Sequence, residues 1–485
     1  MADQVPMSSP TASETLAVAD SAADSVTFAP GEVAARIDRL PLTAVQWRLC
    51  LITQLAWAVV IAGDTYASLL YPYVWSHNFS HFAYSWLNAV QVGVGILIGE
   101  YSGGYLADWL GRRKVITLGC FLAGLFILVA PLVAPNYVGL MLLSLGQSTG
   151  IGFVLATNVL YMHEIVPPKW RGRLTQGAQS TTIIWTLLGL AAGYYWVPSH
   201  YKLYLAVIGG AGVLATGLML TLPESPRWLE AKGRVDDARR TLERIEDAVR
   251  RRVGTLPDPD PGAMRQRPVG VTDRVPLREI FHGVYLHRTL VLLPAWVLGY
   301  SGIVYGFVAY QAIQLISFGF SAKAFFVVIM IMYGPAYAAG VICSAFFNER
   351  FERRTLILVG AVIFALSFVI IWVFSYVDQI NAMQYVGWGL SGVGSALWLF
   401  NMYNYTSAAY PTRLRSTATG ITDGLGHLGA IFGPVIVVAL GDATSKHGFY
   451  GFMLYVAIVG ALVPALLVRF FGMRQKDAVL EVVAT

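Results

Sequence analysis

Residues Gly104–Lys114 read Gly-Tyr-Leu-Ala-Asp-Trp-Leu-Gly-Arg-Arg-Lys and separate two long apolar runs. A related segment, Ala345–Arg354, reads Ala-Phe-Phe-Asn-Glu-Arg-Phe-Glu-Arg-Arg and follows at an offset of 241 residues. A second pair of similar segments, Pro167–Arg173 and Pro411–Arg415, has an offset of 244 residues. A nearly constant offset between two pairs indicates that the chain contains two copies of one unit.

The composition is typical of a chain that lies mostly in lipid. Of its 485 residues, 56% are hydrophobic and 13% are charged, whereas soluble domains carry about 25% charged residues. This composition excludes a disordered chain and argues against an ordinary cytosolic enzyme. A bilayer crossing needs roughly 20 apolar residues and must be helical, because lipid cannot satisfy exposed backbone groups. Apolar runs of that length occur at about residues 49–72, 85–107, 115–133, 137–162, 174–196, 203–222, 289–313, 324–347, 355–376, 382–406, 418–440 and 449–471.

We therefore expect an all-α membrane protein with twelve transmembrane helices in two six-helix halves. The expected regions are a tail over residues 1–46, a first half over 47–222, a central loop over 223–286, a second half over 287–472 and a tail over 473–485. Apolar residues at helical spacing predict an amphipathic surface helix over 234–252 of the central loop. A short amphipathic lead-in over 31–47 is expected to lie on the membrane surface.

The basic residues predict the orientation. If the N-terminus is inside, only Lys202, Lys323 and Lys446 of the 34 Lys and Arg residues fall on outer connections. Cytoplasmic loops normally carry the excess of Lys and Arg. Both termini and the central loop are therefore expected in the cytoplasm, and the protein in the cell (inner) membrane. Because the basic residues lie in these loops, the net charge of +6 does not indicate nucleic-acid binding.

Ionisable side chains inside predicted crossings are the first candidates for function, because burying them in lipid is costly. Asp64 lies about 22 Å of helix rise into the first crossing, where it could bind a coupling proton or only stabilise a bend near Gly63. His427 lies near the middle of the eleventh crossing and could bind an anionic substrate, or be a neutral hydrogen-bonded residue. Asp423 lies one turn from His427 and could pair with it, as a gate or as part of a proton relay.

A second group of candidates lies at the membrane surface. Carboxylates and guanidinium groups there can form ion pairs that latch one conformation, and this role is favoured over substrate contact. The residues of this predicted latch are Asp108, Arg112, Arg113, Glu164 and Arg171.

Aromatic and amide side chains at middle depth could form the wall of a substrate cavity. Such faces suit a flat organic acid or heteroaromatic ring, although aromatic residues in membrane helices more often pack against lipid or other helices. The candidates are Trp185, Tyr300, Tyr305, Tyr333, Trp398 and Asn401.

The sequence contains no supported catalytic, phosphate-binding or metal-binding motif. Gly424–Gly429 formally matches the pattern Gly-x-Gly-x-x-Gly, but it lies inside a predicted crossing with no strand before it. Cys50, Cys120 and Cys343 lie far apart without metal-ligand spacing. We expect no enzymatic activity, no metal and no cofactor.

The motifs resemble those of the major facilitator superfamily. Gly104–Lys114 is similar to the signature loop between its second and third helices. Glu164 with Arg171–Arg173, and Pro223–Leu229, resemble the sugar-porter branch. Ile37–Leu42 and Tyr410–Arg415 resemble the bacterial metabolite:proton symporters, which include niacin and aromatic-acid carriers and are related to synaptic-vesicle glycoprotein 2. The resemblance implies transport by alternating access of two halves.

Together these features predict a secondary active transporter, expected to act as a monomer. It would take up a small organic solute with protons, and an aromatic or other organic carboxylate is the expected substrate. Asp64 and Asp423 would couple proton binding, and His427 would contact the anionic group. The alternatives are a sugar or polyol transporter, an uncoupled facilitator, and a receptor that has lost transport.

Overall fold

The computed structural model describes residues 32–70, 78–134, 136–167, 169–170, 174, 181–259, 277–308, 311, 315, 321–347, 350–375, 382–410, 412–440 and 451–474. The described elements are all helical. In the first half they are α2 (Glu32–Asp38), α3 (Ala44–Leu70), α5 (His81–Asn88), the π-helical η2 (Ala89–Gly95), α6 (Ile96–Leu110), α7 (Arg112–Val133), α8 (Tyr137–Ile165) and α10 (Thr182–Met219).

The central loop contains α11 (Pro226–Ala231) and α12 (Val235–Val253). The remaining elements are η3 (Leu277–Phe281), α14 (Gly283–Gly299), η4 (Tyr300–Phe307), α16 (Ala322–Val328), η6 (Ile329–Tyr333), α17 (Gly334–Phe347), α18 (Arg353–Ser375), α19 (Ala382–Ala408), α20 (Thr412–Gly426), α21 (Leu428–Leu440), η7 (Tyr455–Leu462) and α23 (Val463–Phe471).

Each of the twelve predicted crossings contains a helix. Several crossings are interrupted: α5, η2 and α6 form the second, and α20 and α21 form the eleventh. The fifth and sixth crossings are joined within α10, where His200 departs from helical geometry (φ −135°, ψ 44°). By length and composition alone, eight helices of the described chain could span a membrane.

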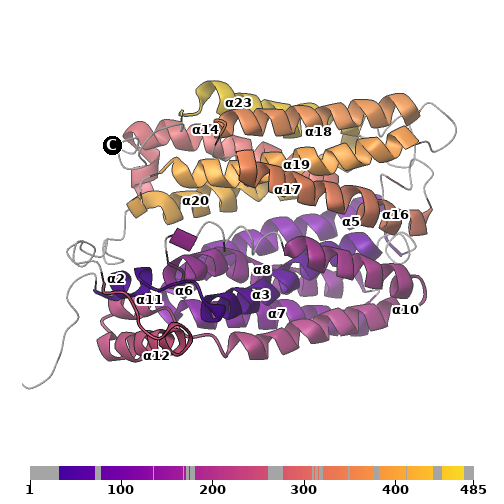
Figure 1. Ribbon diagram of the computed structural model, residues 1–485. Coiled ribbons are helices and arrows are strands. Elements are labelled where there is room, and N and C mark those ends of the chain that lie inside the picture. Colours follow the sequence, from indigo (N-terminus) through magenta and orange to yellow (C-terminus); the bar gives the residue numbers. More distant parts are fainter. Residues whose placement is uncertain are drawn as a thin grey trace, which may run out of the picture.

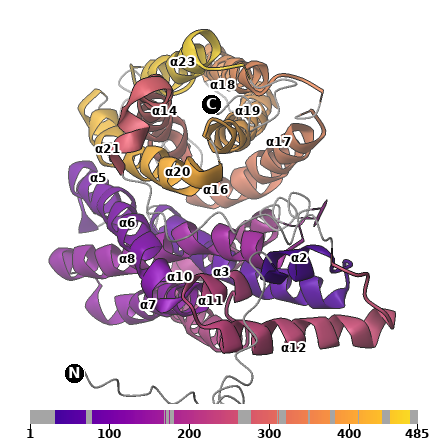
Figure 2. The same ribbon diagram turned by 90° about the vertical axis from the view of Figure 1, so that its left-hand side faces the viewer.

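The helices gather into two bundles that lie side by side (Figures 1 and 2). The first half supplies α3 to α10, and the second supplies α14 to α23. Contacts between the halves include α21 with η2 and α5, α10 with α16 and α17, and α20 with α6. The second and eleventh crossings therefore meet at the boundary between the halves.

Glycines allow the eleventh crossing to approach the seventh closely. A Cβ atom at Gly429 would collide with the carbonyl of Val297, and one at Gly433 with the backbone of Ser301. Small residues provide such contacts in membrane proteins, where association depends on close packing rather than on the hydrophobic effect. This packing fixes α21, and with it the position of His427, against η4.

The helices α2, α11 and α12 lie together at one end of the first half (Figure 1). We call this end the basic end, because Arg112 and Arg113 lie there as well. The apolar face of α12 is covered by α2: Val33 and Ile37 pack against Leu242. The expectation that residues 31–47 lie on the membrane is therefore wrong for α2, because its apolar side chains are buried against α12.

Charged contacts add to this packing. The carboxylate of Glu246 on α12 accepts hydrogen bonds from Arg36 Nη2 and Arg39 Nη2, both at 2.7 Å. The side chain of Glu246 is 3% exposed, and those of Arg36 and Arg39 are 16% and 14% exposed. Arg227 of α11 pairs with Asp38 at the end of α2 at 2.5 Å. The segment that precedes the first crossing is thus tied to the central loop.

Replacing Glu246 with Ala is expected to lower the free energy of unfolding by about 2 kcal/mol, because two largely buried guanidinium groups lose their carboxylate. Thermal unfolding of the detergent-solubilised protein measures the effect. Glu243→Ala is the matched control, since Glu243 is exposed on the same helix. Equal melting temperatures for the two variants would show that the contacts of Glu246 with Arg36 and Arg39 do not stabilise the protein.

The same interaction predicts a pH dependence. Burial opposes ionisation of Glu246, but hydrogen bonds from Arg36 and Arg39 outweigh it and hold its pKa below the usual value. A lowered pKa contributes stability that is fully present above the ordinary glutamate pKa of about 4.3. It is lost as the pH falls through the lowered pKa. The difference in melting temperature between wild type and Glu246→Ala should therefore be constant down to about pH 4.3 and shrink below it.

Candidate functional site between the two halves

The eleventh crossing breaks at His427. Helix α20 ends at Gly426, His427 lies in a turn, and α21 begins at Leu428. The opposing part of the seventh crossing is the π-helical η4, which carries Tyr300 and Tyr305. Broken helices and π-helical turns are frequent at functional sites, because they expose backbone groups and redirect side chains.

Asp423 is held by tyrosine hydroxyls. The Tyr300 hydroxyl donates to Asp423 Oδ1 at 2.5 Å and lies 2.7 Å from the hydroxyl of Tyr403. Tyr300 is 2% exposed, whereas Asp423 and Tyr403 are half-buried. The carboxylate thus has hydrogen-bond donors within the bundle and retains partial access to solvent.

His427 bridges several groups. Its Nδ1 lies 3.1 Å from the backbone carbonyl of Asp423 and 3.5 Å from Glu100 Oε2. The ring centre lies 4.5 Å from that of Tyr300 and 5.7 Å from that of Tyr305. His427 is 2% exposed. The sequence suggested a side-chain pair between His427 and Asp423; instead His427 contacts the Asp423 carbonyl, which is free because α20 ends within one turn.

Glu100 is absent from the candidates named from the sequence. It lies on α6 of the first half, and its side chain is 12% exposed. It satisfies the criterion that singled out Asp64, since it is a carboxylate inside a predicted crossing. Its pairing with His427 could not be foreseen, because the two residues are 327 positions apart and meet only through packing of the halves.

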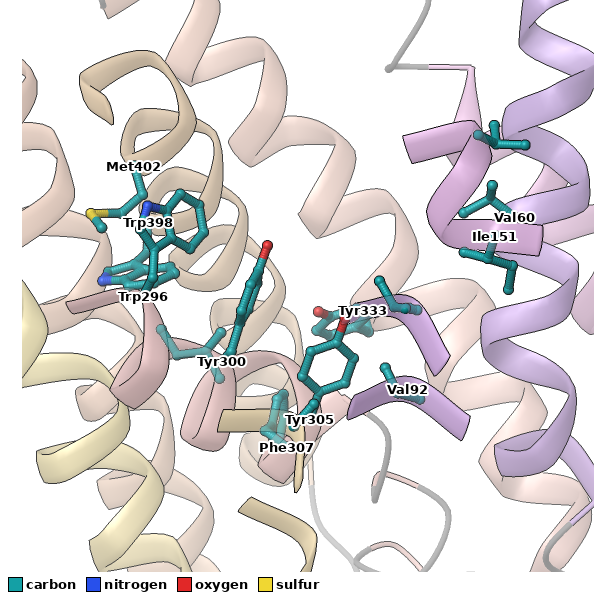
Figure 3. Close-up of a cluster of buried hydrophobic side chains, with 14 of the residues drawn as sticks. Val60, Val92, Ile151, Trp296, Tyr300, Tyr305, Phe307, Tyr333, Trp398 and Met402 are labelled. Atoms are coloured by element: carbon teal, nitrogen blue, oxygen red, sulfur yellow. The ribbon is translucent and has the colours of Figure 1, made fainter. Parts of the chain in front are cut away.

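The aromatic candidates differ in what they contact; Figure 3 shows Tyr300 between Trp296 and Tyr305. Tyr300 and Tyr305 pack against His427. Tyr403, which was not predicted, contacts the hydroxyl of Tyr300. Trp296 was also missed; its ring centre lies 5.0 Å from that of Tyr300 and 4.8 Å from that of Tyr403. These rings form an aromatic wall beside the polar groups.

The other predicted cavity residues lie in helix packing. Tyr333 hydrogen-bonds Ser395 at 3.1 Å, and Trp398 is fully buried with its ring centre 5.9 Å from that of Trp296. The amide of Asn401 donates to Ser344 at 3.1 Å, linking α19 to α17. Trp185 is half-buried on α10, and no described contact joins it to His427.

The position of Asp64 is only partly described. Its backbone lies in α3, and its side chain lies outside the described residues. The preceding carbonyl, of Gly63, accepts a hydrogen bond from Gln91 Nε2 at 3.0 Å. The backbone beside Asp64 is therefore attached to η2 of the second crossing.

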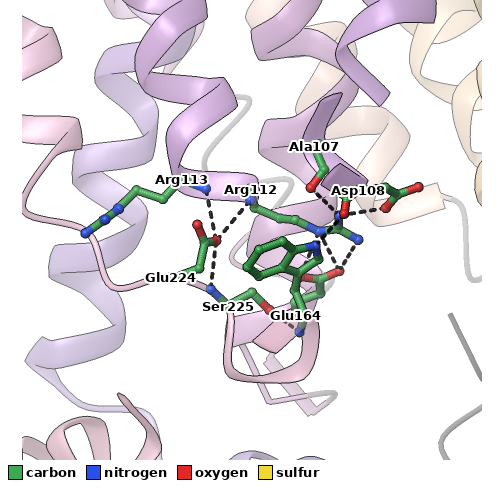
Figure 4. Close-up of polar contacts among 8 residues, drawn as sticks. Ala107, Asp108, Arg112, Arg113, Glu164, Glu224 and Ser225 are labelled. Atoms are coloured by element: carbon green, nitrogen blue, oxygen red, sulfur yellow. Dashed lines mark hydrogen bonds and ion pairs between the residues drawn. The ribbon is translucent and has the colours of Figure 1, made fainter. Parts of the chain in front are cut away.

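Four of the five predicted latch residues lie together at the basic end (Figure 4). The guanidinium of Arg112 donates to Asp108 Oδ1 at 2.7 Å and to the carbonyl of Ala107 at 2.7 Å. It also donates to Glu164 Oε1 at 3.2 Å. The side chain of Arg112 is 3% exposed. One buried cation thus joins the ends of α6, α7 and α8, while Arg171 lies outside the described residues.

Glu224 completes this cluster and was missed from the sequence. Its Oε1 accepts hydrogen bonds from the backbone N–H groups of Arg112, Arg113 and Ser225, at 3.0, 3.1 and 3.0 Å. A carboxylate at the start of α7 also interacts favourably with the helix dipole. Gly111 makes this approach feasible: it has φ of +108°, and a Cβ atom there would collide with Glu224. The contacts described for this cluster all lie within the first half and the segment that follows it.

These observations define a class of protein: two six-helix halves around a polar cluster in the membrane interior, the architecture of a secondary transporter of the major facilitator superfamily. The chain belongs to the sugar (and other) transporter family, which matches residues 65–475. The predicted all-α, twelve-helix membrane fold is thereby confirmed. The protein is a multi-pass membrane transporter of small molecules and is not an enzyme.

Known proteins similar to this chain are transporters. It is 26% identical to the niacin transporter NiaP of Acinetobacter baylyi, covering 93% of this chain and 99% of that protein. It is 25% identical to the inner membrane metabolite transport protein YdjE of Escherichia coli, covering 93% and 98%. The inward-open structure of the xylose transporter XylE from E. coli superposes with a TM-score of 0.69 at 17% identity, covering 90% and 99%.

Arg112→Lys is expected to destabilise the basic end by about 2 kcal/mol, because an ammonium cannot reproduce the planar, multidentate donation of a guanidinium. The readouts are the melting temperature and the rate of solute exchange. Lys114→Gln is the control, since Lys114 is exposed two residues away. A melting temperature of Arg112→Lys equal to that of the control would show that the network is dispensable.

Proposed function

We propose that this protein takes up a small organic carboxylate, most simply an aromatic one, together with protons. The observation that carries the proposal is the position of His427, at the break in the eleventh crossing and between the halves. A protonated imidazole there can bind a carboxylate, because its N–H groups can donate hydrogen bonds to the anion.

The surroundings of His427 support an aromatic carboxylate. Tyr300, Tyr305 and Trp296 supply ring faces beside the imidazole, and aromatic rings stack favourably with one another. Among the described residues of the crossings, Lys and Arg side chains lie near helix ends or beside the break at His200 within α10, which leaves His427 as the described basic side chain deep in the bundle. The relative NiaP is named for niacin, which is itself a heteroaromatic carboxylate.

Asp64 and Asp423 are the proposed proton-coupling residues. A carboxylate in the membrane interior is costly when charged, so proton binding and access to water become linked. Asp108, Arg112, Arg113, Glu164 and Arg171 are proposed as the latch that stabilises one conformation at the basic end. Trp185, Tyr333, Trp398 and Asn401 remain proposed wall residues, more distant from His427.

The basic end is proposed to face the cytoplasm, because it carries the excess of Lys and Arg. Both termini would then be cytoplasmic, in a monomer located in the cell (inner) membrane. Uptake is the proposed direction, since an inward proton gradient would drive solute and proton together.

The purified protein in liposomes with a trapped pH dye is expected to admit protons when an aromatic carboxylate such as nicotinate or benzoate is added outside. His427→Ala should reduce carboxylate-driven influx by about tenfold or more, because the anion loses its charged hydrogen-bond partner. Asp64→Asn should lower proton influx and leave equilibrative exchange.

The panel of solutes also tests the alternatives. Proton influx with xylose or inositol and none with carboxylates would identify a sugar or polyol transporter. Labelled carboxylate that equilibrates without proton movement in wild type would identify an uncoupled facilitator. His287→Ala is a matched control for the histidine change, since His287 lies near the start of α14, away from the site.

A further inference from the structure

The contact between Glu100 and His427 crosses the boundary between the two halves. Glu100 belongs to α6 in the first half, and His427 follows α20 in the second. Glu100 Oε2 lies 3.5 Å from His427 Nδ1, and the two side chains are 12% and 3% exposed. Because the halves move relative to each other during transport, this contact depends on the conformation of the carrier.

Glu100 lies beside the imidazole nitrogen that, under the proposed function, binds a substrate carboxylate. Two oxygen atoms face Nδ1 of His427, the Asp423 carbonyl and the Glu100 carboxylate. Both oxygens are acceptors, so Nδ1 carries a hydrogen. This N–H donates to the Asp423 carbonyl at 3.1 Å, and the Glu100 carboxylate lies beside the same N–H at 3.5 Å. A substrate anion needs that same donor.

Two glycines of α20 lie on the side of this pair that faces Glu100 or the basic end. Gly424 of α20 faces Glu100 of α6. Among the described atoms outside its own helix, a Cβ atom at Gly424 would meet only Glu100 Oε2, at 3.4 Å. At Gly420, one turn nearer the basic end, a Cβ atom would meet no described atom outside its own helix within 4 Å. Among the described residues, no side chain other than that of Glu100 fills the space next to these two glycines.

The charged groups around Glu100 and His427 determine whether a proton must bind together with the substrate anion. The titratable groups facing the pair among the described residues are Asp423 from α20, Tyr300 and Tyr305 from η4, and Tyr403 from α19. Asp423 already accepts a hydrogen bond from Tyr300. The described surroundings of Glu100 thus contain no Lys or Arg to offset a second anion.

We propose that Glu100 competes with the substrate for His427. In the empty carrier the Glu100 carboxylate contacts the imidazole, and on loading a substrate carboxylate replaces Glu100 at His427 while the site binds one proton. This deepens the proposed function and rests on it. In the empty carrier one shared proton leaves the pair without net charge, whether it lies on the imidazole or on the carboxyl. A monovalent anion adds one negative charge, and one further proton cancels it.

Two consequences follow. Loading one anion and one proton leaves the net charge of the site unchanged, so transport is electroneutral. Loading also breaks the contact between the halves, which frees them to move. Asp423, which lies one turn before His427, then acts as the relay position that delivers the proton to the pair.

The experiment uses full-length protein in liposomes with a trapped pH dye, valinomycin and set potassium gradients, and nicotinate or benzoate as the probe. Wild type should admit one proton per anion, at a rate that does not change with membrane potential. Glu100→Gln should keep labelled anion exchange and lose proton influx by about tenfold or more. Glu100→Asp should restore influx in part, and Glu243→Gln, the same chemical change at an exposed site, should resemble wild type.

The outcomes separate the two proposals. Wild type without carboxylate-driven proton influx would end the proposed function and this inference with it. Coupled wild type with full proton influx in Glu100→Gln would overturn the role of Glu100 alone. Potential-dependent influx in wild type would do the same, and this measurement needs no variant to fold. Proton efflux driven by an organic cation would show that Glu100 and Asp423 bind a cation instead.

Discussion

An ionised side chain in the membrane interior must find its partners within the protein, because lipid offers none. Deep in this bundle, the carboxylate of Glu100 lies against His427, and His427 also contacts the backbone carbonyl of Asp423. Asp423 has a tyrosine hydroxyl, and His427 has two oxygen acceptors. The rest of the architecture serves to bring these groups from both halves to one point.

Close backbone packing makes that meeting possible. The glycines of α21 press it against η4, and the break after α20 turns His427 toward the first half. At the basic end a different arrangement holds the first half together. There Arg112 and Glu224 join the ends of several helices through buried hydrogen bonds. A rigid half is useful to a carrier, because motion is then confined to the boundary where the ionisable groups lie.

The central loop is also attached to the first half by packing, because α12 lies against α2. Helix α12 was foreseen from its apolar spacing, but its partner α2 was expected on the membrane. Burial of Val33 and Ile37 against Leu242 changed that assignment. An amphipathic pattern indicates that the apolar face of a helix is covered, but it does not distinguish a lipid surface from another helix.

The sequence by itself determined the fold class. Long apolar runs, a repeated loop motif and the distribution of Lys and Arg follow from the physics of a bilayer, which acts on each segment independently. It also located Asp423, His427, Tyr300 and the residues around Arg112. Only the tertiary structure brought Glu100 to His427, added Trp296 and Tyr403 to the aromatic wall, and showed which neighbouring helices Trp398 and Asn401 contact. These are contacts between distant segments, and helix spacing within one segment cannot specify them.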